Sequence, residues 1–136
     1  MIKLAGSLDA NVVVRLLTGD IPELQKAAEI LVSNGGNFLL SDVCLIEVIY
    51  ALNQYYKIPR QELKKNILDL RNNPNIFYNH ALYEETLVLY VNHEALSIED
   101  CYMAAKAHTD QALPLWTFDK KLASQASGQA KLVSQQ

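Results

Sequence analysis

The chain has 136 residues, 50% of them hydrophobic, and carries a formal net charge of −3. This length and composition predict a single globular domain, residues 1–136, that buries a core without disulfides, and they exclude a disordered chain. The net charge excludes broad, non-specific binding of polyanions but leaves room for a local basic patch. No apolar run approaches the length of a transmembrane helix, so we expect no membrane partner.

Two cysteines, Cys44 and Cys101, lie in apolar segments that are predicted to be helical. Neither belongs to a CxxC motif or has histidines at metal-ligand spacing, so we expect core residues rather than a zinc site or a disulfide. The first residues contain no long apolar region of the kind found in signal peptides. Both observations favour a reducing, cytoplasmic location.

Short apolar segments alternate along the chain with helical patterns. The apolar segments predict strands over residues 3–8, 37–40, 76–78, 114–117 and 131–133. Capping residues, proline and apolar periodicity predict helices over residues 11–17, 22–33, 41–56, 60–71, 82–92 and 97–110, and a last short helix after Asp119. This alternation is typical of βαβ units, and it predicts a three-layer α/β/α fold around a central, mainly parallel sheet of short strands.

Asp9 directly follows the first predicted strand and precedes a predicted helix. In an open α/β sheet, ligands bind at the carboxyl ends of the strands, so a carboxylate there is a candidate site residue. Aspartate is also a preferred N-cap, and capping is an equally good explanation of Asp9. Asp119 follows the fourth predicted strand in the same way, and we expect both residues at one edge of the same sheet.

Two further acidic residues come from predicted helices. Asp100 has a structural alternative, because Ser97-x-x-Asp100 has the spacing of a capping box. Glu47 is the only charge in a helix that is apolar nearly all round, and we therefore expect that helix to be buried. No Lys or Arg lies one turn away to pair with Glu47, and burying an unpaired carboxylate is costly. The alternative is a side chain that tilts into solvent or pairs with a distant segment.

If Asp9, Glu47, Asp100 and Asp119 converge, their mutual repulsion must be relieved. Two carboxylates about 5 Å apart repel by roughly 3 kcal/mol at an effective dielectric constant of about 20. A cation relieves this cost, and oxygen ligands without His or Cys suit Mg²⁺ or Mn²⁺ better than zinc. Such a centre lowers the pKa of a bound water and neutralises a phosphoryl transition state, which is the chemistry of phosphodiester hydrolysis.

Four motifs occur in a fixed order along nearly the whole chain: Leu8-Asp9-x-Asn11, Ile46-Glu47-Val48, Ser97-x-x-Asp100 followed by Ala104-Ala105, and Thr117-Phe118-Asp119-Lys120-Lys121-Leu122. This ordered set resembles the PIN-domain ribonucleases, and among them the VapC-type toxins of prokaryotic toxin–antitoxin pairs. The resemblance implies that one or two Mg²⁺ ions are held by four catalytic carboxylates, Asp9, Glu47, Asp100 and Asp119. It also implies that Asn11 and Thr117 orient ligands or substrate.

The same resemblance implies the partners. We expect a homodimer that cuts structured RNA such as tRNA and that is inhibited by a cognate antitoxin, whose tail occupies the active-site groove. Ala10 stands where many relatives carry a hydroxyl residue, a departure that removes one hydrogen bond near the metal. Arg15, about one helical turn beyond Asn11, is a candidate for holding RNA phosphates. A surface or salt-bridged arginine is the structural alternative.

The sequence therefore predicts a Mg²⁺-dependent endoribonuclease, the toxin of a type II toxin–antitoxin system. A catalytically silent PIN-like module that binds a partner protein is the alternative. A receiver-type phosphoacceptor domain is weaker, because it expects an adjacent acidic pair after the first strand, where Asp9 stands alone. A phosphatase built on Asp-x-Asp is weaker as well, because Asn11 occupies the second position.

Overall fold

The computed structural model describes residues 2–135 of the chain. Residues up to His80 form one compact unit, unit 1, and residues from Ala81 onward form a second, unit 2. Within the described range, no helix combines the length and the apolar character that crossing a membrane requires.

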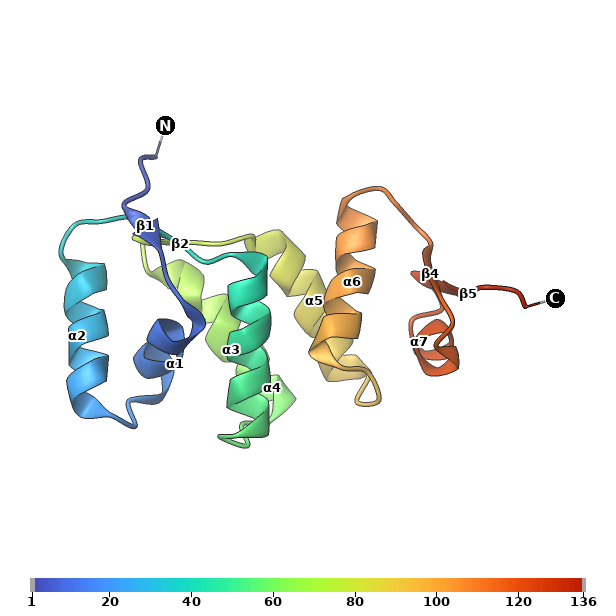
Figure 1. Cartoon of the computed structure of the whole chain (residues 1–136), viewed down its shortest axis with the longest axis horizontal. Coiled ribbons are helices and arrows are strands. Elements are labelled where there is room, and N and C mark those ends of the chain that lie inside the picture. The colour runs from blue at the N-terminus through green and yellow to red at the C-terminus, as the bar shows by residue number, and fades with distance from the viewer. Residues whose placement is uncertain (1, 136) are drawn as a thin grey trace. The chain divides into compact units, whose positions relative to one another are not determined.

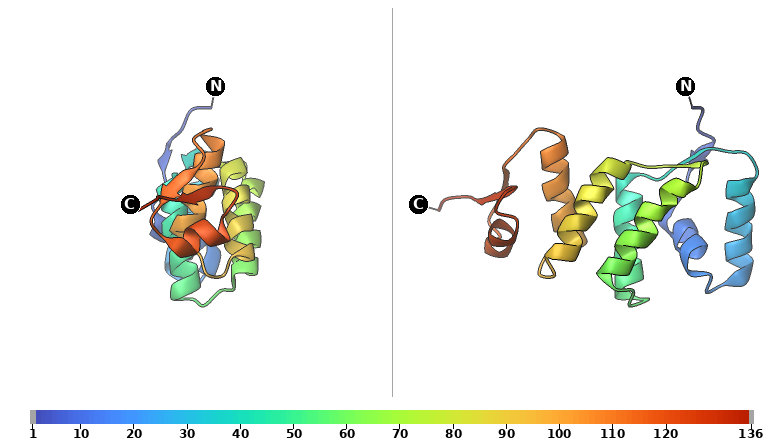
Figure 2. Two further views of the ribbon diagram at one scale, coloured as in Figure 1. Left: turned by 90° about the vertical axis from the view of Figure 1, so that its right-hand side faces the viewer. Right: turned by 180° about the vertical axis from the view of Figure 1, so that it is seen from behind.

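Unit 1 is built around a small parallel sheet. In chain order its elements are β1 (Gly6–Ser7), α1 (Ala10–Thr18), α2 (Pro22–Ser33), β2 (Phe38–Leu39), α3 (Asp42–Gln54), α4 (Arg60–Leu68), the 3-10 helix η1 (Asp69–Asn72) and β3 (Ile76–Phe77) (Figure 1). β2 lies between β1 and β3 and pairs with both in parallel, with Phe38 opposite Gly6 on one side and Ile76 on the other. α1 packs against α2 and α3, and α3 packs against α4 (Figure 2).

Unit 2 consists of α5 (His80–Asn92, whose first residue closes unit 1), α6 (Ile98–Thr109), β4 (Leu115–Thr117), α7 (Lys120–Gln125) and β5 (Ala130–Leu132). The rings of Tyr83 on α5 and Tyr102 on α6 lie 6.2 Å apart between centroids. β4 and β5 pair in parallel, with Leu115 opposite Ala130, and α7 packs against both strands. A cis peptide bond between Leu113 and Pro114 precedes β4.

The structure confirms the predicted alternation of helices with short parallel strands, but most strands are shorter than predicted. β1 covers only Gly6–Ser7 of the predicted residues 3–8, and β5 begins one residue earlier than predicted. The predicted helix over residues 60–71 divides into α4 and η1. An apolar pattern identifies residues that are suited to a strand, but the length of a strand depends on how far the neighbouring strand offers hydrogen bonds.

β1 and β4 belong to different hydrogen-bonded sheets, β1–β2–β3 in unit 1 and β4–β5 in unit 2. The expectation that Asp9 and Asp119 follow strands of the same sheet is therefore wrong for the described strands. Alternation of strands and helices predicts parallel pairing, but it does not say which strands are neighbours, because strand order is decided by tertiary packing.

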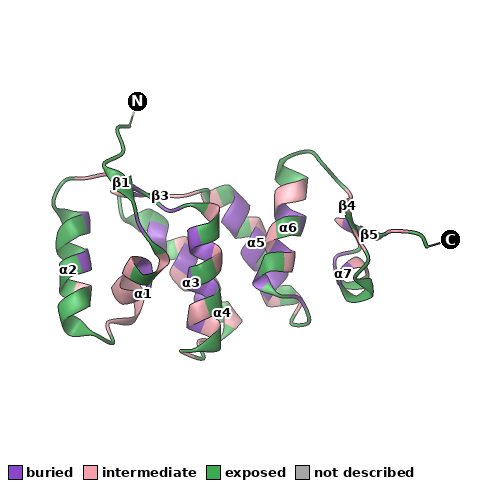
Figure 3. Cartoon of the chain, in the orientation of Figure 1, coloured by how far each residue is buried: buried purple, intermediate pink, exposed green. Residues whose placement is uncertain are grey.

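α3 buries one face only. Its buried side chains are Cys44, Leu45, Val48, Ile49 and Leu52. Val43, Glu47 and Tyr50 are exposed, and Figure 3 shows buried and exposed residues alternating around this helix. The expectation of a helix buried nearly all round is thus wrong, because apolar composition does not decide which face finds a partner. Both cysteines are buried, as predicted.

Candidate active site

Asp9 lies just beyond the carboxyl end of β1 and is the N-cap of α1. Leu8 extends the register of β1, since its N–H donates to the Leu39 carbonyl at 3.0 Å and its side chain is buried. The Oδ1 atom of Asp9 accepts the N–H of Ala10 at 2.8 Å. Among the described residues, no hydrogen bond reaches Oδ2. Capping and ligand binding are therefore compatible at Asp9.

Glu47, in the middle of α3, is exposed to solvent. This is the alternative that the sequence leaves open for Glu47, a side chain that tilts into solvent. The cost of burial therefore gives no reason to expect a partner for its charge. Within residues 2–135 its carboxylate makes no hydrogen bond or ion pair. Burial raises the pKa of the Cys44 thiol, the negative charges of Asp9 and Glu47 add to the same shift, and together they bring this pKa to about 11. Asp9 and Glu47 both belong to unit 1, and the charges of both act on the Cys44 thiol.

Asp100 occupies the first turn of α6 and is half-buried. The Ser97 hydroxyl accepts the N–H of Asp100 at 3.1 Å, so Ser97 is the N-cap that the sequence predicts. Across the described residues, the Asp100 carboxylate accepts no hydrogen bond, either from the N–H of Ser97 or from any other group. The capping box is half formed, and the carboxylate is available to a ligand.

Asp119 caps α7 in unit 2. Its Oδ1 atom accepts the N–H groups of Lys121 and Leu122 at 2.9 and 3.1 Å. The Thr117 hydroxyl accepts the N–H of Asp119 at 2.9 Å. Thr117 therefore orients the backbone of Asp119, and Asp119 in turn holds the start of the helix with one carboxylate oxygen.

A cavity of about 400 Å³ in unit 1 contains several of the predicted site residues. It lies between α1 and α3, and its walls are formed by Ala10, Asn11, Val14, Arg15, Glu47, Ala51, Tyr55 and Tyr56. Asn11, Arg15 and Glu47 thus line one cavity. These three residues are predicted from the sequence, but the two tyrosines are not, because they follow the last turn of α3 and belong to no motif.

Arg15 forms a salt bridge, which is the structural role that the sequence left open beside phosphate binding. Its Nη1 atom lies 2.9 Å from Oδ1 of Asp20 and donates to the Tyr56 hydroxyl at 2.9 Å. The Tyr56 hydroxyl donates to Oδ2 of Asp20 at 2.6 Å, and the Thr18 hydroxyl donates to Oδ1 at 2.8 Å. The hydrogen bonds from Tyr56 and Thr18 hold the pKa of Asp20 at about 2, below its ordinary value. This network ties the end of α1 to the end of α3.

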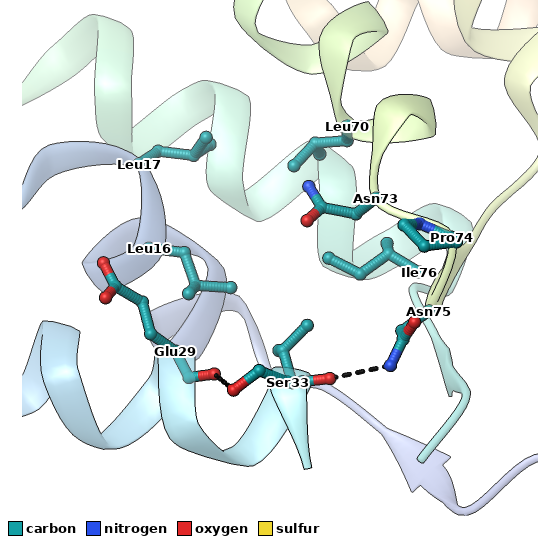
Figure 4. A pocket seen from close by; sticks show the side chains of 10 residues that line it. Leu16, Leu17, Glu29, Ser33, Leu70, Asn73, Pro74, Asn75 and Ile76 are labelled. Carbon is teal, nitrogen blue, oxygen red and sulfur yellow. Dashed lines mark hydrogen bonds between the residues drawn. The ribbon is translucent and has the colours of Figure 1, made fainter. Parts of the chain in front are cut away.

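A second cavity in unit 1, of about 650 Å³, lies at the amino end of β3 (Figure 4). Leu16, Leu70 and Ile76 contribute to its apolar wall, and Glu29 is the only charged residue that lines it. The Asn75 side chain there donates to the Val32 carbonyl at 2.9 Å. None of the predicted site residues lines this cavity, so it is not the candidate active site.

The carboxylates divide evenly between the units, Asp9 and Glu47 in unit 1 and Asp100 and Asp119 in unit 2. Among residues 2–135, no group of three or more His, Cys, Asp or Glu side chains is placed to hold a metal ion. The donors themselves are oxygen atoms, the ligands that hard divalent cations such as Mg²⁺ prefer. The chemistry of the donors fits the predicted ion, and the four-carboxylate centre stays a prediction.

The comparison with protein families gives one match. The PIN domain family model covers residues 7–127, a segment that includes Asp9, Glu47, Asp100 and Asp119. A search of curated proteins found no relative of the chain. PIN domains are generally metal-dependent nucleases, and the match confirms the predicted three-layer α/β/α fold class. Because the match extends over most of its length, the chain belongs to the PIN domain family.

Proposed function

We propose that this protein is a Mg²⁺-dependent endoribonuclease that hydrolyses RNA phosphodiester bonds. Asp9, Glu47, Asp100 and Asp119 are its catalytic carboxylates and together hold the ion. The observation that carries the proposal is the PIN domain match over residues 7–127, a segment that contains these four carboxylates in the order that the motifs predict. When bound, Mg²⁺ supplies an acidified water and neutralises charge on the phosphoryl oxygens, and Mn²⁺ fits the same donors.

The protein's own part in this chemistry is orientation. Asp9 and Asp119 each engage backbone N–H groups through Oδ1 alone, so both carboxylates are held in place with Oδ2 left for a ligand. Thr117 fixes the backbone of Asp119, and Asn11 faces the same cavity as Glu47. Groups that are positioned before the reaction need no reorganisation in the transition state.

RNA cleavage by the purified protein tests the proposal. Asparagine caps helices as well as aspartate does, so Asp9→Asn keeps the start of α1. Asp100→Asn keeps the fold because the Asp100 carboxylate accepts no hydrogen bond from a described residue. We expect each variant to lose more than about 100-fold of the cleavage rate, the scale on which loss of one transition-state group acts. EDTA should abolish cleavage and added Mg²⁺ should restore it. Glu99→Gln, an exposed position next to Asp100, is the matched control and should cleave normally. Full cleavage by both Asn variants rejects the assignment.

We further propose that the enzyme is a VapC-type toxin of a type II toxin–antitoxin system. On this proposal it works in the cytoplasm as a homodimer, cuts structured RNA such as tRNA, and is inhibited by a cognate antitoxin. The ordered motifs around Asp9, Glu47, Asp100 and Asp119 support it.

Induced expression in bacteria should arrest growth with the wild type and not with Asp100→Asn. Co-expression of a neighbouring small gene for a DNA-binding protein should restore growth, and sedimentation should give a dimer. Normal growth with an active nuclease contradicts the toxin role.

A catalytically silent PIN-like interaction module is the second candidate. Calorimetric titration with Mg²⁺ distinguishes the two. The nuclease proposal expects saturable binding by the wild type and weaker binding by Glu47→Gln. No measurable heat of binding favours the silent module.

A further inference from the structure

The cavity between α1 and α3 is lined by two side chains, those of Tyr55 and Arg15, that have no role in the proposed metal site. Tyr55 lines it and is 72% exposed, and Arg15 contributes a cation to its wall. Its volume of about 400 Å³ lies within the range of small-ligand sites. An aromatic ring and a guanidinium together are the two groups that recognise a base and a phosphate in single-stranded nucleic acids.

Arg15 is held in a way that leaves part of its guanidinium open. Every hydrogen bond that this group makes with described residues involves Nη1, which contacts Asp20 and Tyr56. Nε and Nη2, which form the other edge of the planar fork, have no partner among residues 2–135, and a quarter of the side chain is exposed. A fork edge with two N–H donors matches two oxygens of a phosphate. Asp20 and Tyr56 therefore fix the guanidinium without occupying its phosphate-binding edge.

Tyr55 is presented by a segment whose backbone is well determined by hydrogen bonds. Its N–H donates to the Ala51 carbonyl at 2.9 Å, and the Ile58 N–H donates to the Leu52 carbonyl at 3.1 Å across Lys57, which has a φ of 56°. The Tyr50 ring lies edge-to-face with the Tyr55 ring at 6.3 Å. An aromatic side chain on a fixed backbone is a platform on which a base stacks with little loss of side-chain freedom.

We propose that this cavity binds one nucleotide of an RNA strand next to the metal-holding Glu47. The base stacks on Tyr55 and the phosphate accepts hydrogen bonds from Nε and Nη2 of Arg15. Asp20 and Tyr56 are positioning residues that act through Arg15. This subsite rests on the proposed ribonuclease function, and it identifies where the RNA strand lies relative to α1 and α3.

Fluorescence anisotropy with a labelled single-stranded oligoribonucleotide, in EDTA to prevent cleavage, tests the subsite. Loss of one stacked base weakens binding by roughly 5-fold to 150-fold, so we expect an effect of that size for Tyr55→Ala. Tyr55→Phe keeps the ring and should recover most of the affinity. Ile30→Ala, at an exposed apolar position on α2, is the control for surface substitution in general and should bind like the wild type.

The salt dependence of binding tests the role of Arg15 separately. Loss of one phosphate contact lowers the slope of log affinity against log salt concentration by about 0.7 for a single strand. We expect that change for Arg15→Gln and a smaller one for Tyr56→Phe, which leaves the cation but removes its hydroxyl partner. A purely structural Arg15 would leave the slope unchanged.

The outcomes separate the subsite from the nuclease activity. Unchanged affinity in Tyr55→Ala together with an unchanged salt slope in Arg15→Gln overturns the subsite, even where the wild type cleaves RNA. Failure of the wild type to bind the oligoribonucleotide overturns it as well. Binding that depends on Tyr55 and Arg15 in a protein that does not cleave RNA supports the subsite and counts against the nuclease proposal alone.

Discussion

Asp20 joins three side chains at the end of α1. Both of its oxygens accept hydrogen bonds, from Thr18 and Arg15 at Oδ1 and from Tyr56 and Arg15 at Oδ2. These hydrogen bonds favour the charged form of Asp20, and the one from Tyr56 contributes most. Together they lower the pKa of Asp20 to about 2. Asp20 thus holds Arg15 and Tyr56, two residues that line the candidate cavity, and its lowered pKa makes the stability of the fold depend on pH.

The lowered pKa of Asp20 predicts a pH-dependent stability. The unfolded state, with a pKa near 3.8, binds a proton more readily than the folded state, so the contribution of Asp20 is fully present above about pH 4. It is lost as the pH falls through about 2. We expect Asp20→Asn to lower the melting temperature at pH 7 and to match the wild type at pH 2. Glu99→Gln controls for loss of one exposed charge, and an effect of Asp20→Asn that does not vary with pH contradicts the argument.

The Cys44 thiol reports on the two carboxylates of unit 1. Its pKa of about 11, raised first by burial and then by Asp9 and Glu47, keeps it protonated at pH 8. Only the thiolate reacts with a disulfide reagent, so we expect Cys44 to react slowly until the protein unfolds. In a Cys101→Ala background, Asp9→Asn and Glu47→Gln should each speed the reaction at a fixed pH. Equal rates in all three proteins would show that these carboxylates do not act on Cys44.

Helix starts in this protein are determined by local hydrogen bonds. Ser41, Ser97 and Asp119 each accept backbone N–H groups from the first turn of the helix that they precede. A cap satisfies donors that have no partner inside the helix, so it acts regardless of the distant parts of the chain. For Asp119 this means that the helix cap and the proposed metal ligand are the same side chain.

The two roles of Asp119 are separable by substitution. Asp119→Asn keeps an oxygen that accepts the N–H groups of Lys121 and Leu122, so we expect stability near that of the wild type and loss of RNA cleavage. Asp119→Ala removes the cap and should lower the free energy of unfolding in urea by about 1 kcal/mol. If Asp119→Asn is as unstable as Asp119→Ala, its lost activity reflects folding and not the proposed ligand role.

At the scale of the whole molecule, the sequence predicts one domain, and the chain forms two compact units, one that ends in sequence at His80 and one that begins at Ala81. A single domain unfolds in one cooperative transition that every probe reports at the same midpoint. Trp116, the one tryptophan of the chain, lies on β4 and reports on unit 2. Far-ultraviolet circular dichroism reports on the helices of both units.

We therefore expect urea unfolding followed by Trp116 fluorescence and by circular dichroism to give the same midpoint. Mg²⁺ at ten times its dissociation constant should raise the free energy of unfolding by about 1.4 kcal/mol in the wild type. Asp9→Asn should reduce this increase. Two separate transitions contradict the one-domain prediction, and an unchanged response to Mg²⁺ in Asp9→Asn contradicts the role of Asp9 as a metal ligand.

Local signals in the sequence determined much of this protein. Pro22 at the start of α2, Ser97 before α6 and Asp119 before α7 mark helix starts, because proline geometry and capping involve only neighbouring residues. The positions of Asp9 and Asp119 just beyond strands are also predicted locally, from the short apolar segments that precede them. The order of the acidic motifs also indicated the PIN family, since it is a property of the chain and needs no coordinates.

Only the tertiary structure decided which side chains meet. The exposure of Glu47 depends on which face of α3 is covered, and its apolar neighbours in sequence gave the opposite expectation. The bond between Arg15 and Tyr56 joins residues 41 positions apart, at a separation where no helical periodicity or capping rule applies. The pairing of β1 with β2 and of β4 with β5 likewise depends on contacts between distant segments. Local propensity acts over a few residues, whereas burial, ion pairing and strand order are properties of the packed chain.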